Sequence, residues 1–179
     1  MPQYVALLRG ISPTNPAMRN EKLRGVFEDL GLTHVQTVIS SGNVLFESPI
    51  TDVHELEGKI EEALPAHLGF TSTTIIRSRE QLQQLVNKKP FKGVEHTQKT
   101  YLTVTFFKNE FRTELDFPYR PENKTYEILG MYDYAMCSVV DLTGAKTPDL
   151  MSWLEKQFGK EITTRTWKTV ERILKKLDT

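Results

Sequence analysis

Apolar positions along the chain recur with a period that switches between two and about 3.6, which predicts alternating strands and helices. The apolar run over residues 4–8 predicts a strand buried on both faces. Apolar residues spaced over 23–30 mark one face of a helix, and Gly31 is placed to end it. Two short runs, 35–39 and 44–46, have the alternation of paired strands joined by a tight turn.

A second helical pattern covers residues 53–64. Asp52 is suited to cap its first turn, and Pro65 is expected to bend or end it. A strand over 73–76 then completes the order β-α-β-β-α-β. This is the order of a split βαβ, or ferredoxin-like, unit.

The remaining chain repeats this order after a short helix opened by a Ser78–Gln81 capping box. The predicted elements are a strand over 101–107, a reduced helix over 110–115, strands over 126–129 and 134–140, a helix over 150–158 entered at Thr147-Pro148, and a strand over 162–165. A last helix follows. We therefore expect an α+β protein of two ferredoxin-like halves packed together, residues 1–78 and 100–179. The halves are joined near 81–90, within a helical connector over 79–99. An extra C-terminal helix ends the second half.

Composition excludes several classes of function. The 23 Lys and Arg residues balance 23 Asp and Glu residues, so the chain lacks the overall positive field that supports nucleic-acid binding. The four histidines have no Cys or His partner at metal-ligand spacing, so no metal site and no cofactor are predicted. Phosphate-loop, dinucleotide and hydrolase motifs are also missing from the sequence. Whether the protein is an enzyme stays open.

Two features bear on the cellular compartment. The single Cys137 lies in a strand-like apolar run, which predicts a buried structural thiol and suits a reducing cytoplasm. The apolar run near the N-terminus stops at Arg9, too soon for a signal peptide or a membrane span. We expect a cytoplasmic protein without a membrane partner, and its oligomeric state is open.

The start of the last helix carries positive charge where the helix dipole favours negative charge. Thr166 occupies the expected N-cap position before Trp167, and Arg165 and Lys168 flank it. Thr169 adds a hydroxyl in the first turn. The pattern indicates a small anionic ligand at this helix end, with a capped helix and solvated cations as the alternative.

Three segments together resemble a known family. Residues 6–11 (Ala-Leu-Leu-Arg-Gly-Ile), residues 41–44 (Ser-Gly-Asn-Val) and residues 164–170 are similar to the motifs of the bacterial family called domain of unknown function 1697. The resemblance implies a two-part α+β fold and no established activity. Family members usually carry a glycine-rich loop after the first motif, where this chain has residues 12–16 (Ser-Pro-Thr-Asn-Pro). They also usually have Asn where this chain has Thr166 and Lys168.

The motifs supply further candidate residues for a site. From the first loop we include Arg9, Gly10, Asn15 and Arg19 as ligand-binding candidates. The hairpin residues Ser41, Gly42 and Asn43 are interpreted as a structural turn, because Gly and Asn tolerate positive φ. Taking the first and third strands of the first half as parallel, we expect Arg9 and this hairpin at opposite ends of the sheet. We expect Arg165 beside Arg9.

These observations leave three hypotheses. The first is a module that binds a small anion or a phosphorylated metabolite at the N-terminus of the last helix. The second is an enzyme on a phosphorylated or nucleotide substrate, using Arg9 and Arg165, which also needs a general base. The third is a protein-interaction or oligomerisation unit that uses exposed sheet edges.

Overall fold

The computed structural model describes residues 1–40, 42–122, 125–142 and 150–179. It is a mixed α+β structure with two four-stranded antiparallel sheets and five described α-helices. The elements in chain order are β1 (Gln3–Leu8), the 3-10 helix η1 (Pro16–Met18), α1 (Asn20–Asp29), β2 (Thr33–Thr37), β3 (Asn43–Glu47), α2 (Val53–Leu68), β4 (Thr74–Ser78), α3 (Arg79–Asn87), β5 (Thr100–Phe107), β6 (Tyr126–Tyr132), β7 (Ala135–Asp141), α4 (Leu150–Phe158), β8 (Ile162–Thr166) and α5 (Trp167–Leu177).

The chain divides into two compact units. The first unit contains Met1–Gln83 together with Arg172–Thr179, and the second contains Gln84–Glu171. The boundaries between the units therefore fall inside α3 and inside α5. The second half of α5 is part of the first unit.

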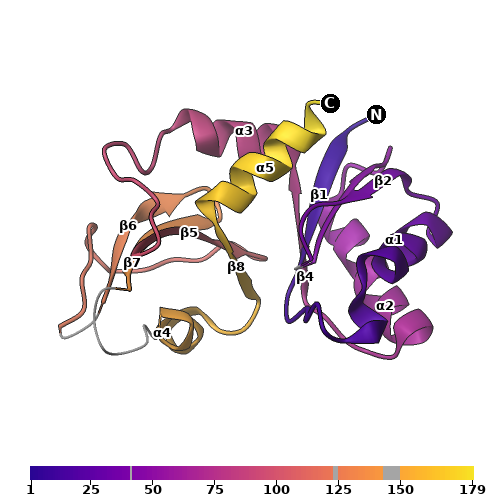
Figure 1. Cartoon of the computed structure of the whole chain (residues 1–179), viewed down its shortest axis with the longest axis horizontal. Coiled ribbons are helices and arrows are strands. Elements are labelled where there is room, and N and C mark those ends of the chain that lie inside the picture. Colours follow the sequence, from indigo (N-terminus) through magenta and orange to yellow (C-terminus); the bar gives the residue numbers. More distant parts are fainter. Residues whose placement is uncertain (41, 123–124, 143–149) are drawn as a thin grey trace. The chain divides into compact units, whose positions relative to one another are not determined.

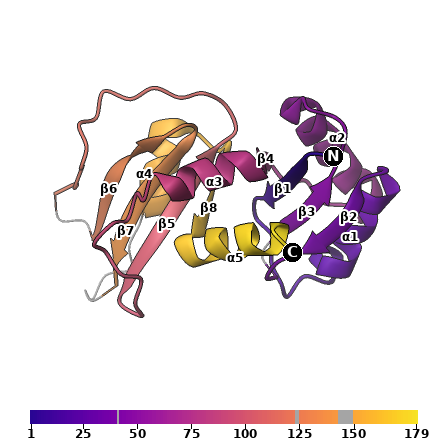
Figure 2. The same ribbon diagram turned by 90° about the horizontal axis from the view of Figure 1, so that it is seen from above.

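The sheet of the first unit has the strand order β2-β3-β1-β4, which can be followed in Figure 2. Helices α1 and α2 lie against one face of this sheet, as Figure 1 shows. The core between them combines alternate residues of β1 and β3, such as Ala6 and Phe46, with helix residues such as Phe27 and Leu64. The intervening strand residues, including Val5, are buried as well. Burial on both faces explains why β1 has a continuous apolar sequence.

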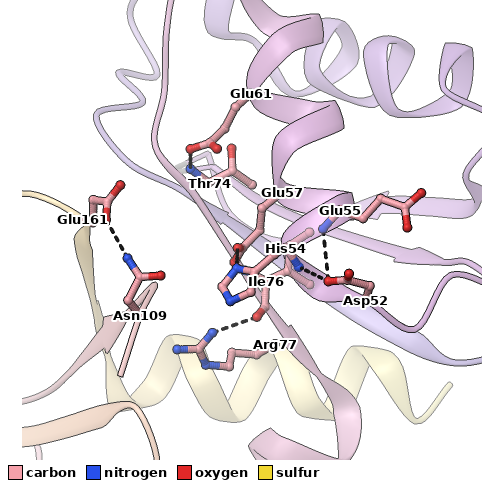
Figure 3. Close-up of polar contacts among 10 residues, drawn as sticks. All are labelled: Asp52, His54, Glu55, Glu57, Glu61, Thr74, Ile76, Arg77, Asn109 and Glu161. Carbon is pink, nitrogen blue, oxygen red and sulfur yellow. Dashed lines mark hydrogen bonds and ion pairs between the residues drawn. The ribbon is translucent and has the colours of Figure 1, made fainter. Parts of the chain in front are cut away.

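The outer edge of β4 is covered by two glutamates of α2, as Figure 3 shows. Glu57 accepts a hydrogen bond from the amide of Ile76 at 2.9 Å, and Glu61 accepts one from the amide of Thr74 at 3.1 Å. One turn of helix separates the two carboxylates, and two residues of strand separate the two amides. The helix thereby satisfies the backbone donors of an edge strand that would otherwise be open to pairing with another chain.

The ends of the helices agree in part with the sequence patterns. Asp52 caps α2 through the amides of His54 and Glu55, and Ser78 and Gln81 form the predicted reciprocal capping box at α3. Helix α2, however, runs three residues past Pro65. Its last turn extends to Leu68, and Gly69, with a φ of 79°, ends the helix there.

The sheet of the second unit has the order β6-β7-β5-β8, also visible in Figure 2. Its core joins sheet residues such as Ile128 and Met136 to Leu154 of α4. Cys137 lies on β7 with no exposed surface, so the prediction of a buried thiol is confirmed. Burial raises the pKa of this thiol to about 12.

One predicted element of the second unit is wrong. Residues 110–115 form no helix and continue as irregular chain after β5. The reason is tertiary packing, because the Phe111 ring stacks on Phe107 with 3.7 Å between centroids and also meets Phe158 edge to face. The expected helix entry at Thr147-Pro148 lies outside the described residues.

Helix α5 begins at Trp167 and buries Val170, Ile173, Leu174 and Leu177, as its apolar spacing predicts. Within the first unit, two polar contacts hold its C-terminal end. Gln3 Nε2 donates to the carbonyl of Leu177 at 2.9 Å, and Arg79 pairs with Asp178. None of the described helices is long and apolar enough to cross a lipid bilayer.

Candidate functional site

The first motif and the hairpin meet at one end of the first sheet. Strands β1 and β3 are antiparallel, with Leu7 opposite Asn43, and the amide of Leu8 donates to the carbonyl of Gly42 at 2.9 Å. This corrects the expectation that Arg9 and the hairpin lie at opposite ends. That expectation treated the two strands as parallel, and antiparallel pairing places the end of β1 beside the start of β3.

At Gly42 the hairpin closely approaches the end of β1 and the loop that follows it. Its φ is 82°, and a Cβ atom at this position would lie 2.7 Å from Ile11 Cγ1 and 3.0 Å from the carbonyl oxygen of Leu8. Glycine is therefore required twice, for its backbone conformation and for its lack of a side chain. Asn43 is buried and its Nδ2 donates to the carbonyl of Val38 at 2.9 Å. Ser41 lies outside the described residues.

The loop after β1 is fixed through its backbone. The amide of Arg9 donates to the carbonyl of Thr73 at 3.0 Å, and Ser72 Oγ donates to the carbonyl of Arg9 at 2.7 Å. Gly10 follows with a φ of 76°. Three chain segments thus converge here: the Arg9 loop, the hairpin, and the residues that lead into β4.

The other two candidates of this loop lie at starts of helices. Asn15 caps η1, because its Oδ1 accepts from the amide of Ala17 at 3.0 Å. Arg19 is exposed and stands at the N-cap position of α1 without a capping side-chain bond. Its carbonyl accepts from the amide of Leu23. Asn15 therefore has a local structural role, and the exposed Arg19 side chain is available to solvent.

The first turn of α5 has the predicted cap. Thr166 Oγ1 accepts from the amide of Thr169 at 3.3 Å, and the two threonine hydroxyl oxygens are 3.0 Å apart. Trp167 packs edge to face on Phe91, with 5.1 Å between ring centroids. The aromatic contact fixes the entry to the helix and leaves the threonine hydroxyls at its N-terminus.

Positive charge gathers around this helix end, but the two predicted cations differ in setting. The half-buried Arg165 donates from one guanidinium nitrogen to Thr163 Oγ1 at 2.7 Å and to the carbonyl of Thr164 at 3.0 Å. Burial lowers its pKa to about 10. Lys168 is exposed in the first turn of α5. The hydrogen bonds to Thr163 and Thr164 direct Arg165 back along β8, whereas Lys168 stands on the helix itself.

His96 joins this cluster and was missed as a site residue by the sequence pattern. Partial burial, followed by the charge of Lys168, lowers the pKa of its imidazole. Its Nδ1 accepts from the amide of Leu102 at 3.2 Å, and its ring stacks on Tyr101. The proton of the neutral ring is therefore on Nε2, where it can be donated. No sequence signal marks this residue, because the contact depends on how the segment before β5 folds.

Elsewhere, His54 and Glu57 form a histidine–carboxylate pair, with 2.8 Å between Nδ1 and Oε1. His54 is exposed and Glu57 is buried; both side chains are drawn in Figure 3. Within the described ranges, no three His, Cys, Asp or Glu side chains gather closely enough to hold a metal ion. The pair therefore has no further metal-ligating partner among those residues, and we assign it to the support of β4.

Comparisons with known proteins identify relatives without assigning an activity. The solved structure of a conserved bacterial protein, SP0830 from Streptococcus pneumoniae, superposes with a TM-score of 0.72 at 20% sequence identity, covering 100% of this chain and 99% of that one. At this identity the similarity concerns the fold alone. No curated protein matches the chain. A family model described as protein of unknown function (DUF1697) matches residues 1–132, and the chain belongs to that family.

Proposed function

We propose that the protein binds a small anion or a phosphorylated metabolite at the N-terminus of α5. The observation that carries this proposal is the charge in the first turn of the helix. Helices α1, α2 and α3 each have a glutamate there, as the dipole favours, whereas α4 has no charged residue there. Helix α5 has no acidic residue in its first turn and has Lys168 instead. A bound anion would supply the negative charge that the sequence of α5 omits.

The groups around the helix end suit such a ligand chemically. The first amides of a helix have no partners within the helix and donate toward an anion. Lys168 adds a charged donor, and the Nε2–H of neutral His96 adds a neutral one. One of the Thr166 and Thr169 hydroxyls donates to the other, which leaves one hydroxyl hydrogen for the ligand. Donors of these kinds recognise phosphate and sulfate oxygens.

Arg165 contributes at longer range in this proposal. Its hydrogen bonds to Thr163 and Thr164 hold the guanidinium in one orientation beside β8. Positive charge fixed in a half-buried place is screened less by salt than charge on an exposed side chain. Arg165 thus strengthens the positive potential at the end of β8, while Lys168 makes the direct contact.

The enzyme alternative needs a general base in the same unit as Arg165. The charge of Lys168 lowers the pKa of His96, but Nδ1 of this ring already accepts a hydrogen bond from the amide of Leu102. Arg9, the other arginine of that hypothesis, belongs to the first unit. The interaction-unit alternative relies on open sheet edges; that of β4 is covered by Glu57 and Glu61, which leaves β2, β6 and β8 as the edge strands it could use. Anion binding is therefore the function we favour.

A thermal-shift titration tests the proposal. Phosphate, sulfate and nucleotides at low salt should raise the melting temperature of the wild type, because a ligand at 100 times its dissociation constant adds about 2.7 kcal/mol. Lys168→Gln and Arg165→Ala should each reduce this increase. Lys92→Gln, which removes one exposed charge from the same unit, is the matched control and should leave it unchanged. Equal increases in all four proteins, or none in the wild type, would refute the proposal.

We also infer that each unit is built on a ferredoxin-like arrangement. The support is the shared strand order, since β2-β3-β1-β4 and β6-β7-β5-β8 place corresponding strands in corresponding positions. The first unit has the complete β-α-β-β-α-β sequence of elements. In the second, the described residues between β5 and β6 (108–122 and 125) form no helix where the first has α1. This comparison supports descent of the two halves from one ancestral unit.

A further inference from the structure

A groove lies beside the C-terminal half of α5, whereas the proposed anion site is at the N-terminus of that helix. It consists of two hollows, of about 300 Å³ and about 360 Å³, that share Lys176 and Thr179 in their walls. Every residue that lines them belongs to the first unit. We call it the α5–β2 groove, because one wall is formed by the end of α5 and the other by β2 and the residues that follow it. Each hollow reaches the size of small-molecule sites.

Three cations line this groove from a single helix. Arg172, Lys175 and Lys176 are spaced i, i+3 and i+4, which brings them to one side of α5, and all three line the larger hollow. Among the described residues, no acidic side chain lines that hollow, whose opposite wall is Thr37, Val38 and Ile39. Cations near a helix C-terminus are favoured by the dipole, which accounts for their place on the helix. The dipole does not explain why these three cations line a hollow to which the described residues contribute no acidic side chain.

Two carboxylates at the groove or beside it in the sequence already have partners. Glu47, which lines the smaller hollow, is in contact with His34, and Asp178 pairs with Arg79. The larger hollow thus gathers three cationic side chains, in a chain whose formal net charge is zero.

The rest of the groove offers uncharged hydrogen-bonding groups. Gln3 and Gln36 line the smaller hollow with His34. His34 and Ile39, one in each hollow, have φ angles of 51° and 61°, which is rare for residues other than glycine and most unusual for a β-branched one. Such conformations cost about 1–3 kcal/mol each and concentrate at ligand sites. Both strained positions belong to the β2 wall, opposite the cations.

We propose that the α5–β2 groove binds a small molecule that carries a pyrophosphate group. Three adjacent cations match the roughly three negative charges of a pyrophosphate better than the charge of a single phosphate or carboxylate. Arg172 supplies the planar donor pair that binds phosphate oxygens in parallel, and Lys175 and Lys176 supply point charges. The polar remainder of the molecule lies over Gln3 and Gln36. This site is independent of the one proposed at the N-terminus of α5.

Inorganic pyrophosphate is the probe for the test, with amide resonances of the full-length protein as the readout. We expect saturable shifts at Gln36, Thr37 and Ile39. The variant Arg172→Gln/Lys175→Gln/Lys176→Gln should weaken binding tenfold or more, since each lost charged contact is worth roughly that factor. The control Lys22→Gln/Arg24→Gln/Lys59→Gln removes the same charge from exposed positions of the same unit and should bind like the wild type.

The outcomes separate this site from the one at Lys168. Retained shifts at Gln36 and Ile39 in Lys168→Gln support the groove, whatever happens to the proposed anion site. Shifts confined to Trp167–Thr169, or equal weakening in the two triple variants, overturn it. Orthophosphate and citrate should bind at least tenfold more weakly than pyrophosphate. Equal binding of citrate would overturn the assignment to pyrophosphate.

Discussion

Replacing Gly42 with alanine should destabilise the first unit more than a glycine-to-alanine change that alters backbone conformation alone. A left-handed conformation costs an L-residue about 1–2 kcal/mol. The new Cβ would also lie 2.7 Å from Ile11 Cγ1 and 3.0 Å from the backbone oxygen of Leu8. Relieving such contacts in packed structure costs about 1–3 kcal/mol. The sum, about 2–5 kcal/mol, is a large share of the 5–15 kcal/mol typical of a folded domain.

Urea denaturation measures this loss directly, and Gly31 provides the control. Gly31 has nearly the same φ, 84°, but nothing lies within 4 Å of the Cβ that alanine would add. Gly31→Ala should therefore show the conformational cost alone, about 1–2 kcal/mol. If Gly42→Ala lost no more stability than Gly31→Ala, the close approach of the hairpin to the end of β1 would have no energetic weight, and our reasoning about this junction would be wrong.

Four further predictions concern single side chains. Glu57→Ala should cost about 1–3 kcal/mol, measured by urea denaturation, because it leaves the buried amide of Ile76 without an acceptor. Thr166→Ala should cost about 1 kcal/mol through the lost cap, by the same assay and with or without phosphate. Cys137 should react with a thiol reagent only on unfolding, since it is buried and its pKa is raised to about 12; fast labelling of the native protein would contradict this. The lowered pKa of His96 means that the unfolded chain takes up its proton first as pH falls, so stability should decline below about pH 6.5, and His96→Gln should reduce that decline in melting experiments across pH.

Local spacing of apolar residues was enough to predict most elements. Strand β1 and helix α5 follow from patterns that burial enforces within a few residues, and the caps at Asp52 and Thr166 follow from side-chain chemistry at helix ends. The helix expected at 110–115 failed because Phe111 is held by Phe107, a contact that no local pattern contains.

The candidate site shows the same limit at longer range. The sequence places Arg165, Thr166 and Lys168 together because they are neighbours in the chain. It gives no indication of His96, and it led to the wrong end of the sheet for the hairpin, because the relative direction of β1 and β3 is set by the path of the intervening chain. The cations at 172, 175 and 176 look in sequence like an ordinary solvated helix face. Only the fold places Ile39 and its neighbours opposite them.

The division of α5 between the two units has a consequence for how the protein is made. Arg172–Thr179 belong to the first unit, yet they are synthesised after the whole of the second. While the ribosome is still adding the second unit, the first lacks the Gln3–Leu177 hydrogen bond and the Arg79–Asp178 ion pair. Its β1–β4 sheet can form early, but the unit is complete only when the end of α5 has emerged. Neither unit therefore finishes folding long before the other, although each has its own core.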